Sequence, residues 1–394
     1  MREPLIYLDH NATTPVRPEV LEAMLPYLRE EFGNPNSVYW LGQRARKAVE
    51  EARAQVAALV GAAQETEVIF TSCGSESDVM AISGAAWAVW DSSRGKRRRI
   101  LSSPIEHEAV RGILKVLEKR GFGVDLVGVD SEGLVDPAEV AGRLTPETAL
   151  VSIMHANNEV GSVEPIEEIA ALCRERGVVF HTDAVQSAGK LPLDAQKMGL
   201  DLLSLSGHKL GAPKGVGALY ARRGARLAQT ITGHQEKNRR GGTENVAGIV
   251  AFGKACELAR RELGSPRVLA LRRKLEEGVL RIPGSRLNGH PAKRLPHCAH
   301  FSFQGLDGHH LVVALDLEGI CVSSGPACSS GSATPSHVLT AMGVDPSLAT
   351  GSIRVSLGPS NSEADLDRFL EVLPKAVDKL RQVPLASLRE SPGA

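Results

Sequence analysis

A lysine follows a strand-like apolar run in residues 204–209, which read SLSGHK. Lys209 would therefore stand at the carboxyl end of a buried strand, where open α/β sheets bind their ligands. An amine in that position is partly desolvated, so its pKa falls and it can form imines with carbonyl compounds. A solvated surface lysine is the alternative, and this segment alone does not separate the two interpretations.

A turn of small residues lies in residues 71–78, which read TSCGSESD. It follows one apolar run and precedes a helical pattern, and Ser75 with Asp78 fits a capping box. The free N–H groups at the start of such a helix bind phosphate, and Ser206 and His208 could add side-chain donors. A capped helix without a ligand is the alternative. The turn is not a Walker loop, because no Gly-Lys-Ser/Thr follows it.

An acid stands at the end of a third apolar run, in residues 180–186, which read FHTDAVQ. A buried carboxylate such as Asp183 needs a cationic partner, and a protonated pyridine nitrogen would supply one and make the ring an electron sink. Gln186 could reach the phenolic oxygen of such a ring. Without the lysine, a helix cap would be the simpler role for Asp183.

The elements that must position these residues alternate between short apolar runs and helical patterns from about residue 17 to 250. This alternation predicts an α/β fold with a helix-covered, mostly parallel sheet. The expected strands are 67–71, 100–103, 149–154, 178–182, 202–206 and 216–220. We expect a large domain over 15–254, a smaller α+β domain formed by 1–14 and 255–382, and a frayed tail over 383–394.

Composition excludes several classes of function. The 394 residues contain 46 Lys plus Arg and 46 Asp plus Glu, so no overall field attracts nucleic acid. No window is apolar enough to span a membrane and the N-terminus lacks a signal-peptide pattern, so we expect a cytoplasmic protein. The six cysteines lack paired spacing, which predicts reduced thiols. A metal site at His297, Cys298 and His300 is disfavoured because strand alternation separates the two histidines.

The chain resembles the cysteine desulfurases of the nitrogen-fixation and iron–sulfur housekeeping type, within the class-V aminotransferase family of fold-type-I pyridoxal enzymes. The resemblance covers almost the whole chain and implies a mostly parallel seven-stranded sheet with a smaller α+β domain. Its motifs, in order, are YLDHNATTP (7–15), FGNP (32–35), EH (106–107), HANNE (155–159), SGHK (206–209), GTEN (242–245) and SSGPAC (323–328).

The resemblance implies that the cofactor is pyridoxal 5′-phosphate, held by Lys209 as an imine. His107 would stack on its ring and assist proton transfer, and Asp183 would pair with the pyridine nitrogen. Residues implied in binding its phenolic oxygen and phosphate are Gln186, Gly74, Ser75, Ser206 and His208. Thr243 would reach the phosphate from a second subunit, so a homodimer is implied.

The implied substrate is L-cysteine, whose carboxylate would be bound by Arg354 with help from Asn158, which also lies at the cofactor. Cys328 would attack the substrate sulfur, carry it as a persulfide and leave L-alanine. Small and turn-forming residues around Cys328 predict an exposed loop that could carry the sulfur outward. The implied acceptor is an iron–sulfur scaffold protein or a sulfur-relay protein, and Cys328 could also ligate a transient cluster or metal.

Two positions depart from the usual pattern. Tyr39 replaces a histidine of many relatives, and Pro326 replaces a serine near the thiol. Tyr39 also occurs in selenocysteine lyases, so that activity stays an alternative, as does an aminotransferase on the same fold. A third alternative is a sulfur-carrying assembly subunit with weak turnover, although the intact Lys209, His107, Asp183 and Arg354 argue against it.

Overall fold

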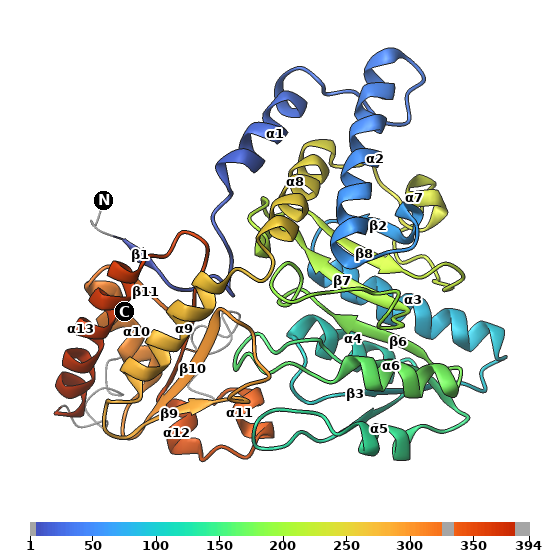
Figure 1. Cartoon of the computed structure of the whole chain (residues 1–394). Coiled ribbons are helices and arrows are strands. Elements are labelled where there is room, and N and C mark those ends of the chain that lie inside the picture. Colours follow the sequence, from blue (N-terminus) through green and yellow to red (C-terminus); the bar gives the residue numbers. More distant parts are fainter. Residues whose placement is uncertain (1–4, 325–334, 383–394) are drawn as a thin grey trace, which may run out of the picture.

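The computed structural model describes residues 5–324 and 335–382. Its larger part is a helix-covered sheet (Figure 1). The helices of this part are α1 (Pro18–Arg29), α2 (Trp40–Val60), α3 (Gly74–Ser92), α4 (Glu108–Glu118), α5 (Pro137–Arg143), α6 (Ile166–Glu175), α7 (Gln235–Asn238), α8 (Val246–Glu262) and the 3₁₀ turns Glu65–Glu67 and η2 (Gly207–Lys209).

The central sheet has seven strands in the order β2-β8-β7-β6-β5-β3-β4. The strands are β2 (Val68–Thr71), β3 (Arg99–Ser102), β4 (Gly123–Leu126), β5 (Thr148–Ser152), β6 (Val179–Asp183), β7 (Leu202–Ser206) and β8 (Gly217–Ala221). All neighbours pair in parallel except β8, which is antiparallel to both β2 and β7. The predicted mostly parallel sheet is therefore confirmed, and β2 and β7 end at the same edge.

Each face of the sheet carries its own apolar core because neighbouring residues of a strand point to opposite sides. Leu101, Val151 and Phe180 pack in the core on the side of α2, α6 and α8. Ile100 and Leu150 pack in the core on the side of α3 and α4. Strands covered on both faces read as continuous apolar runs, which is why they could be found in the sequence.

The smaller part of the molecule has a separate core. Its strands are β9 (Ser285–Asn288), β10 (Cys298–Phe303) and β12 (Ser352–Ser356), in the antiparallel order β12-β10-β9, with β1 (Ile6–Tyr7) paired in parallel to β11 (Ile320–Cys321). Its helices are α9 (Pro266–Val279), α10 (Gly308–Leu317), α11 (His337–Ala341), α12 (Pro346–Thr350) and α13 (Glu363–Arg381). Ser265 precedes α9, and Ser362 caps α13.

The segment between β1 and α1 joins the two parts of the molecule (Figure 1). Asp9 bridges to Ser356 of β12, while the backbone N–H of Thr14 donates to the carbonyl of His208 at 3.1 Å. In residues 5–324 and 335–382, no helix is both long and apolar enough to cross a membrane.

Candidate active site

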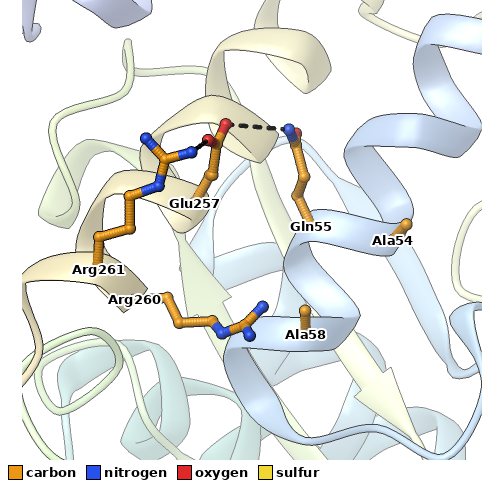
Figure 2. Close-up of a pocket in the computed structure, with 6 residues that line it drawn as sticks. All are labelled: Ala54, Gln55, Ala58, Glu257, Arg260 and Arg261. Carbon is orange, nitrogen blue, oxygen red and sulfur yellow. Dashed lines mark hydrogen bonds and ion pairs between the residues drawn. The ribbon is translucent and has the colours of Figure 1, made fainter.

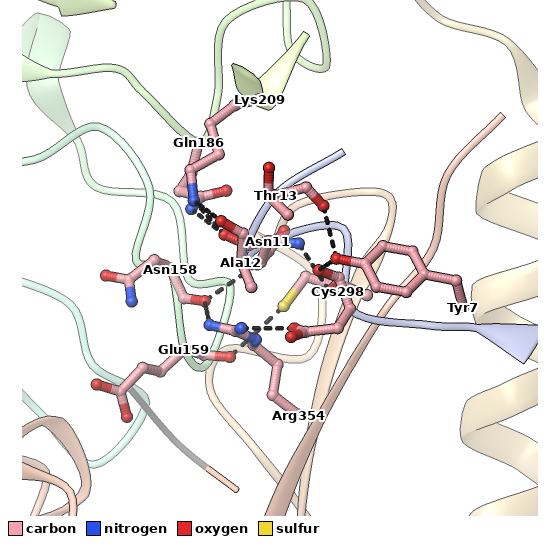
Figure 3. Close-up of polar contacts among 12 residues, drawn as sticks. Tyr7, Asn11, Ala12, Thr13, Asn158, Glu159, Gln186, Lys209, Cys298 and Arg354 are labelled. Carbon is pink, nitrogen blue, oxygen red and sulfur yellow. Dashed lines mark hydrogen bonds and ion pairs between the residues drawn. The ribbon is translucent and has the colours of Figure 1, made fainter. Parts of the chain in front are cut away.

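Lys209 ends the 3₁₀ turn η2, which follows β7 directly. Its Nζ donates to the carbonyl of Ala12 at 2.9 Å and also contacts the carbonyl of Asn11. Figure 3 shows this amine and the Gln186 amide converging on the same stretch of backbone. Lys209 therefore lies at a strand end, where the sequence predicted it. The backbone of Asn11 and Ala12 covers its amine.

The Lys209 amine lies in an environment that disfavours its charge. Burial, together with the positive charges of Arg354 and Lys190, lowers its pKa to about 7, against the opposing effect of Asp9 and Asp183. A large fraction of the amine is then unprotonated near neutral pH, which nucleophilic attack on a carbonyl group requires.

The start of α3 forms a small-residue cradle beside Ser206. A Cβ added at Gly74 would lie 2.9 Å from Val185 Cγ2 and 3.1 Å from Ser206 Cβ, so only glycine fits. The buried Ser206 Oγ has no hydrogen-bond partner among the described residues. The first N–H groups of α3, at Gly74 and Ser75, have no acceptor within the helix. The cradle thus offers backbone and hydroxyl donors to an anion.

The predicted capping box of Ser75 and Asp78 is wrong. Cys73 is the N-cap of α3, and its Sγ accepts from the backbone N–H of Glu76 at 3.4 Å. Asp78 is instead buried against the sheet, 3.7 Å from His181 Nε2. A cysteine cap is uncommon, and nothing in the sequence showed that Asp78 faces inward.

Asp183 stands at the end of β6 and is buried. Its Oδ1 accepts from the backbone N–H of Val185 at 2.8 Å. Burial raises its pKa, while His107 and Lys209 act in the opposite direction. A cation placed against this carboxylate would favour its charged form, and a protonated pyridine nitrogen is such a cation.

Gln186 and His107 lie at the same edge of the sheet. The Gln186 Nε2 donates to the carbonyl of Asn11 at 3.0 Å, and its buried Oε1 has no partner among the described residues. His107 is the N-cap of α4, where its Nδ1 accepts from Ala109 at 3.2 Å. The preceding Glu106 is buried, which raises the pKa of its carboxyl to about 8.

Arg354 of β12 brings the smaller part of the molecule into the site. Its Nη1 donates to the carbonyl of Asn158 at 2.9 Å, and its Nη2 lies 2.7 Å from Asp9 Oδ1. Its buried Nε has no partner among the described residues. The sequence analysis missed the ion pair with Asp9, although Asp9 lies inside the YLDHNATTP motif.

His208 adjoins the lysine, and its Nδ1 is hydrogen-bonded to Thr13 Oγ1 at 3.0 Å. Burial lowers its pKa to about 4, so the ring is neutral near pH 7. Thr243 is exposed on the surface of the single chain. The structure thus brings the predicted site residues of the larger part to one edge of its sheet, except Thr243, and Arg354 of β12 meets them from the smaller part. Cys328 lies outside the described residues.

Two further features are the disfavoured metal site at His297, Cys298 and His300 and a separate hollow between α2 and α8. His297 Nε2 is hydrogen-bonded to Asn11 Oδ1 at 2.8 Å, and within residues 5–324 and 335–382 no group of three His, Cys, Asp or Glu could hold a metal ion. A hollow of about 500 Å³ between α2 and α8 (Figure 2) is lined by Ala54, Gln55, Ala58, Glu257, Arg260 and Arg261, none of them a predicted site residue.

The residues at this edge fit pyridoxal phosphate. Ser206 Oγ and the start of α3 offer unused donors for a phosphate, and Asp183 is a buried acid that lacks a strong cation. Lys209 supplies an amine of which a large fraction is unprotonated near neutral pH. This set of an anion cradle, an acid and an amine matches the three polar ends of the cofactor.

Known proteins agree with this fit. Cysteine desulfurase 2 of Trichormus variabilis is 48% identical over 382 residues, which cover 96% of this chain and 94% of that protein. The IscS cysteine desulfurase of Methanosarcina thermophila is 48% identical over 381 residues, covering 96% of this chain and 93% of its own.

Solved structures agree as well. A NifS-like protein has a TM-score of 0.89 at 38% identity and covers 95% of this chain and 100% of its own. SspA in complex with cysteine has a TM-score of 0.80 at 35% identity and covers 91% of this chain and 100% of its own. The class-V aminotransferase family matches residues 6–369. The chain therefore belongs to the class-V aminotransferase family of pyridoxal-phosphate enzymes, in its cysteine desulfurase group.

Proposed function

We propose that this chain converts L-cysteine to L-alanine and transfers the sulfur to Cys328 as a persulfide. The observation that carries the proposal is the Lys209 amine, which lies at a strand end with its pKa lowered to about 7, beside a buried acid and an arginine. An amine, an acid and a carboxylate-binding guanidinium are the groups that an amino-acid substrate of a pyridoxal enzyme needs.

Cofactor binding uses residues of the larger part of the molecule. Lys209 would hold the cofactor through its amine, Asp183 would keep a proton on the pyridine nitrogen, and His107 would contact the ring. Gln186 binds the phenolic oxygen once its amide turns its N–H groups from the Asn11 carbonyl. The phosphate is bound by Gly74, Ser75, Ser206 and His208.

Substrate binding uses Arg354 and Asn158. The Arg354 Nε is free to donate to a carboxylate, and Asp9 fixes the plane of the guanidinium from the other side. Pyridoxal phosphate, when bound, supplies a ring that accepts the electrons released at the substrate α-carbon. The Lys209 amine takes the proton from that carbon and later returns one.

Sulfur transfer requires the Cys328 thiolate. It attacks the substrate sulfur, a sulfur–sulfur bond forms, and the carbon–sulfur bond breaks with its electrons going to the carbon part, which is protonated and leaves as alanine. The persulfide is then passed to an acceptor thiol on an iron–sulfur scaffold or sulfur-relay protein. Cys328 with partner cysteines could also ligate a transient cluster.

A homodimer is part of the proposal. Large apolar side chains are exposed along α1, the following loop and the start of α2, namely Leu21, Leu28, Phe32, Val38, Tyr39 and Trp40. A second copy would cover such a patch, and Thr243 on the surface would then reach the phosphate of that copy. We also propose the domain division of 15–254 against 1–14 with 255–382.

The experiment is to incubate purified protein with L-cysteine, quantify alanine, and weigh the peptide that contains Cys328. Lys209→Ala should lose the cofactor absorbance band and all turnover. Cys328→Ala should keep the band and lose sulfur transfer, whereas Cys321→Ala, which changes a different partly exposed thiol, should keep both. Normal desulfuration by the Cys328 variant would refute the role of that thiol. A keto acid in place of alanine would indicate an aminotransferase, and a strong preference for selenocysteine would indicate a lyase of that substrate.

A further inference from the structure

A second lysine contacts the backbone of Lys209. The Nζ of Lys190 donates to the carbonyl oxygen of Lys209 at 3.0 Å. Lys190 comes from the turn that follows β6, four residues after Gln186, whereas Lys209 follows β7. The contact therefore connects the turns that follow two neighbouring strands.

The backbone of the turn before Lys190 packs closely against Leu210 and Ala259. Gly189 has φ +69°, and a Cβ there would lie 2.7 Å from Leu210 Cδ2 and 2.8 Å from Ala259 Cβ. The backbone N–H of Lys190 donates to the carbonyl of Ser187 at 3.0 Å. The base of the Lys190 side chain is thus fixed against the residue that follows Lys209, which limits where its ammonium group can go.

The charge of Lys190 acts on the groups around the reactive amine. Burial lowers the pKa of Lys190 to about 8, so the group is still mainly charged near pH 7. That charge contributes to the lowered pKa of Lys209 and also of His10, His208 and His297.

Other charged groups face the Lys209 amine from elements packed against it. Arg354 of β12 acts in the same direction as Lys190, and Asp9 and Asp183 act in the opposite direction. Arg354 is partly neutralised because it is paired with Asp9 at 2.7 Å. Lys190 bonds instead to a neutral carbonyl, so its positive charge is not offset by that contact.

We propose that Lys190 is a positioning residue for the proposed reaction: its ammonium group fixes the backbone of Lys209 and keeps a positive charge behind the reactive amine. The inference rests on the proposed role of Lys209. A lysine with a purely structural role would stabilise the turn without changing the pKa of the Lys209 amine. Measuring that pKa therefore distinguishes a structural role from an electrostatic one.

The test measures the Lys209 amine directly, in the full chain freed of cofactor. An amine-selective acylating reagent is applied over a series of pH values, and modification of Lys209 is quantified by mass spectrometry. The native midpoint is expected near the pKa of about 7. Lys190→Met should raise the midpoint by about 0.5 pH unit or more, the size expected of one nearby charge that is partly screened. Lys190→Arg, which keeps the charge, should restore it.

Lys214→Met is the matched control, because this exposed lysine acts on His208 and is not among the causes of the Lys209 shift. A Lys190→Met midpoint equal to the native one, or a Lys214→Met shift of the same size, overturns the inference. If the Met variant does not fold, Lys190→Gln, which keeps a donor without the charge, gives the same comparison.

In the loaded protein the pH midpoint of the absorbance band should move in the same direction. A native chain that takes up no pyridoxal phosphate would refute the proposed function, whereas the labelling result would still decide the role of Lys190.

Discussion

Arg53 of α2 lies between a buried and an exposed carboxylate. It pairs with Glu236 through two bonds of 2.7 and 2.9 Å, and with Glu50 at 3.1 Å. The Glu236 side chain is 2% exposed and that of Glu50 is 44% exposed. Glu236 also accepts from the backbone N–H of Phe70 at 3.0 Å. Replacing each acid by glutamine therefore compares the same charge change in two environments.

The expected magnitudes differ because burial decides the cost. Glu236→Gln leaves the guanidinium without its buried counter-charge and with only the exposed Glu50 opposite it. It also turns an amide N–H₂ toward one of the guanidinium donors, and together these changes should cost about 3 kcal/mol. Glu50→Gln breaks an exposed pair and should cost less than about 1 kcal/mol. Glutamine has the shape of glutamate, so the left-handed backbone at Glu236, with φ +47°, is equally strained in both chains.

The assay is urea unfolding of the full chain, followed by circular dichroism, for the native protein and both variants. The ion-pair argument is refuted if the two variants lose the same stability, or if Glu50→Gln loses more. The turn that contains Glu236 leads to Thr243, so we also expect Glu236→Gln to bind pyridoxal phosphate more weakly.

Three further predictions concern the cradle, a buried acid and the apolar patch. Gly74→Ala should weaken pyridoxal phosphate binding by about tenfold or more in a fluorescence titration, because its Cβ would lie 2.9 Å from Val185, whereas Gly112→Ala, with nothing within 4 Å, should bind normally. The pKa of Glu106 is raised from 4.5 to about 8, so its contribution to stability is full below pH 4.5 and is lost as the pH rises through 8. The native chain should therefore lose stability relative to Glu106→Gln over this range in urea unfolding, and a difference that is constant with pH would contradict the cause given. Trp40→Glu should convert the proposed dimer to a monomer in sedimentation equilibrium, and an unchanged mass would exclude this patch as the interface.

The sequence was most informative where an element is buried on both faces. The six expected strands match β2, β3, β5, β6, β7 and β8 to within two residues at each end. The edge strand β4 was not predicted, because its residues are partly exposed and include Asp125. β2, at the opposite edge, is buried along its whole length and has the continuous apolar run that β4 lacks.

Within the site, residues at strand ends could be predicted and long-range partners could not. Lys209 and Asp183 each follow an apolar run, so their place at one sheet edge follows from local sequence. The pairing of Asp9 with Arg354 joins residues 345 positions apart and has no local signal. The Cys73 cap was missed because the serine and the acid that follow it fit a standard capping pattern better.

The segment from Ile6 to Ala12 has a consequence for how the enzyme is made. It is synthesised well before its partners, which are Ile320, Arg354 and Ser356. The sheet with its lysine can therefore be complete while the amine is still uncovered. Closing such a long loop is slow compared with local pairing, so the pairing of this segment with the smaller part of the molecule should follow the folding of the sheet.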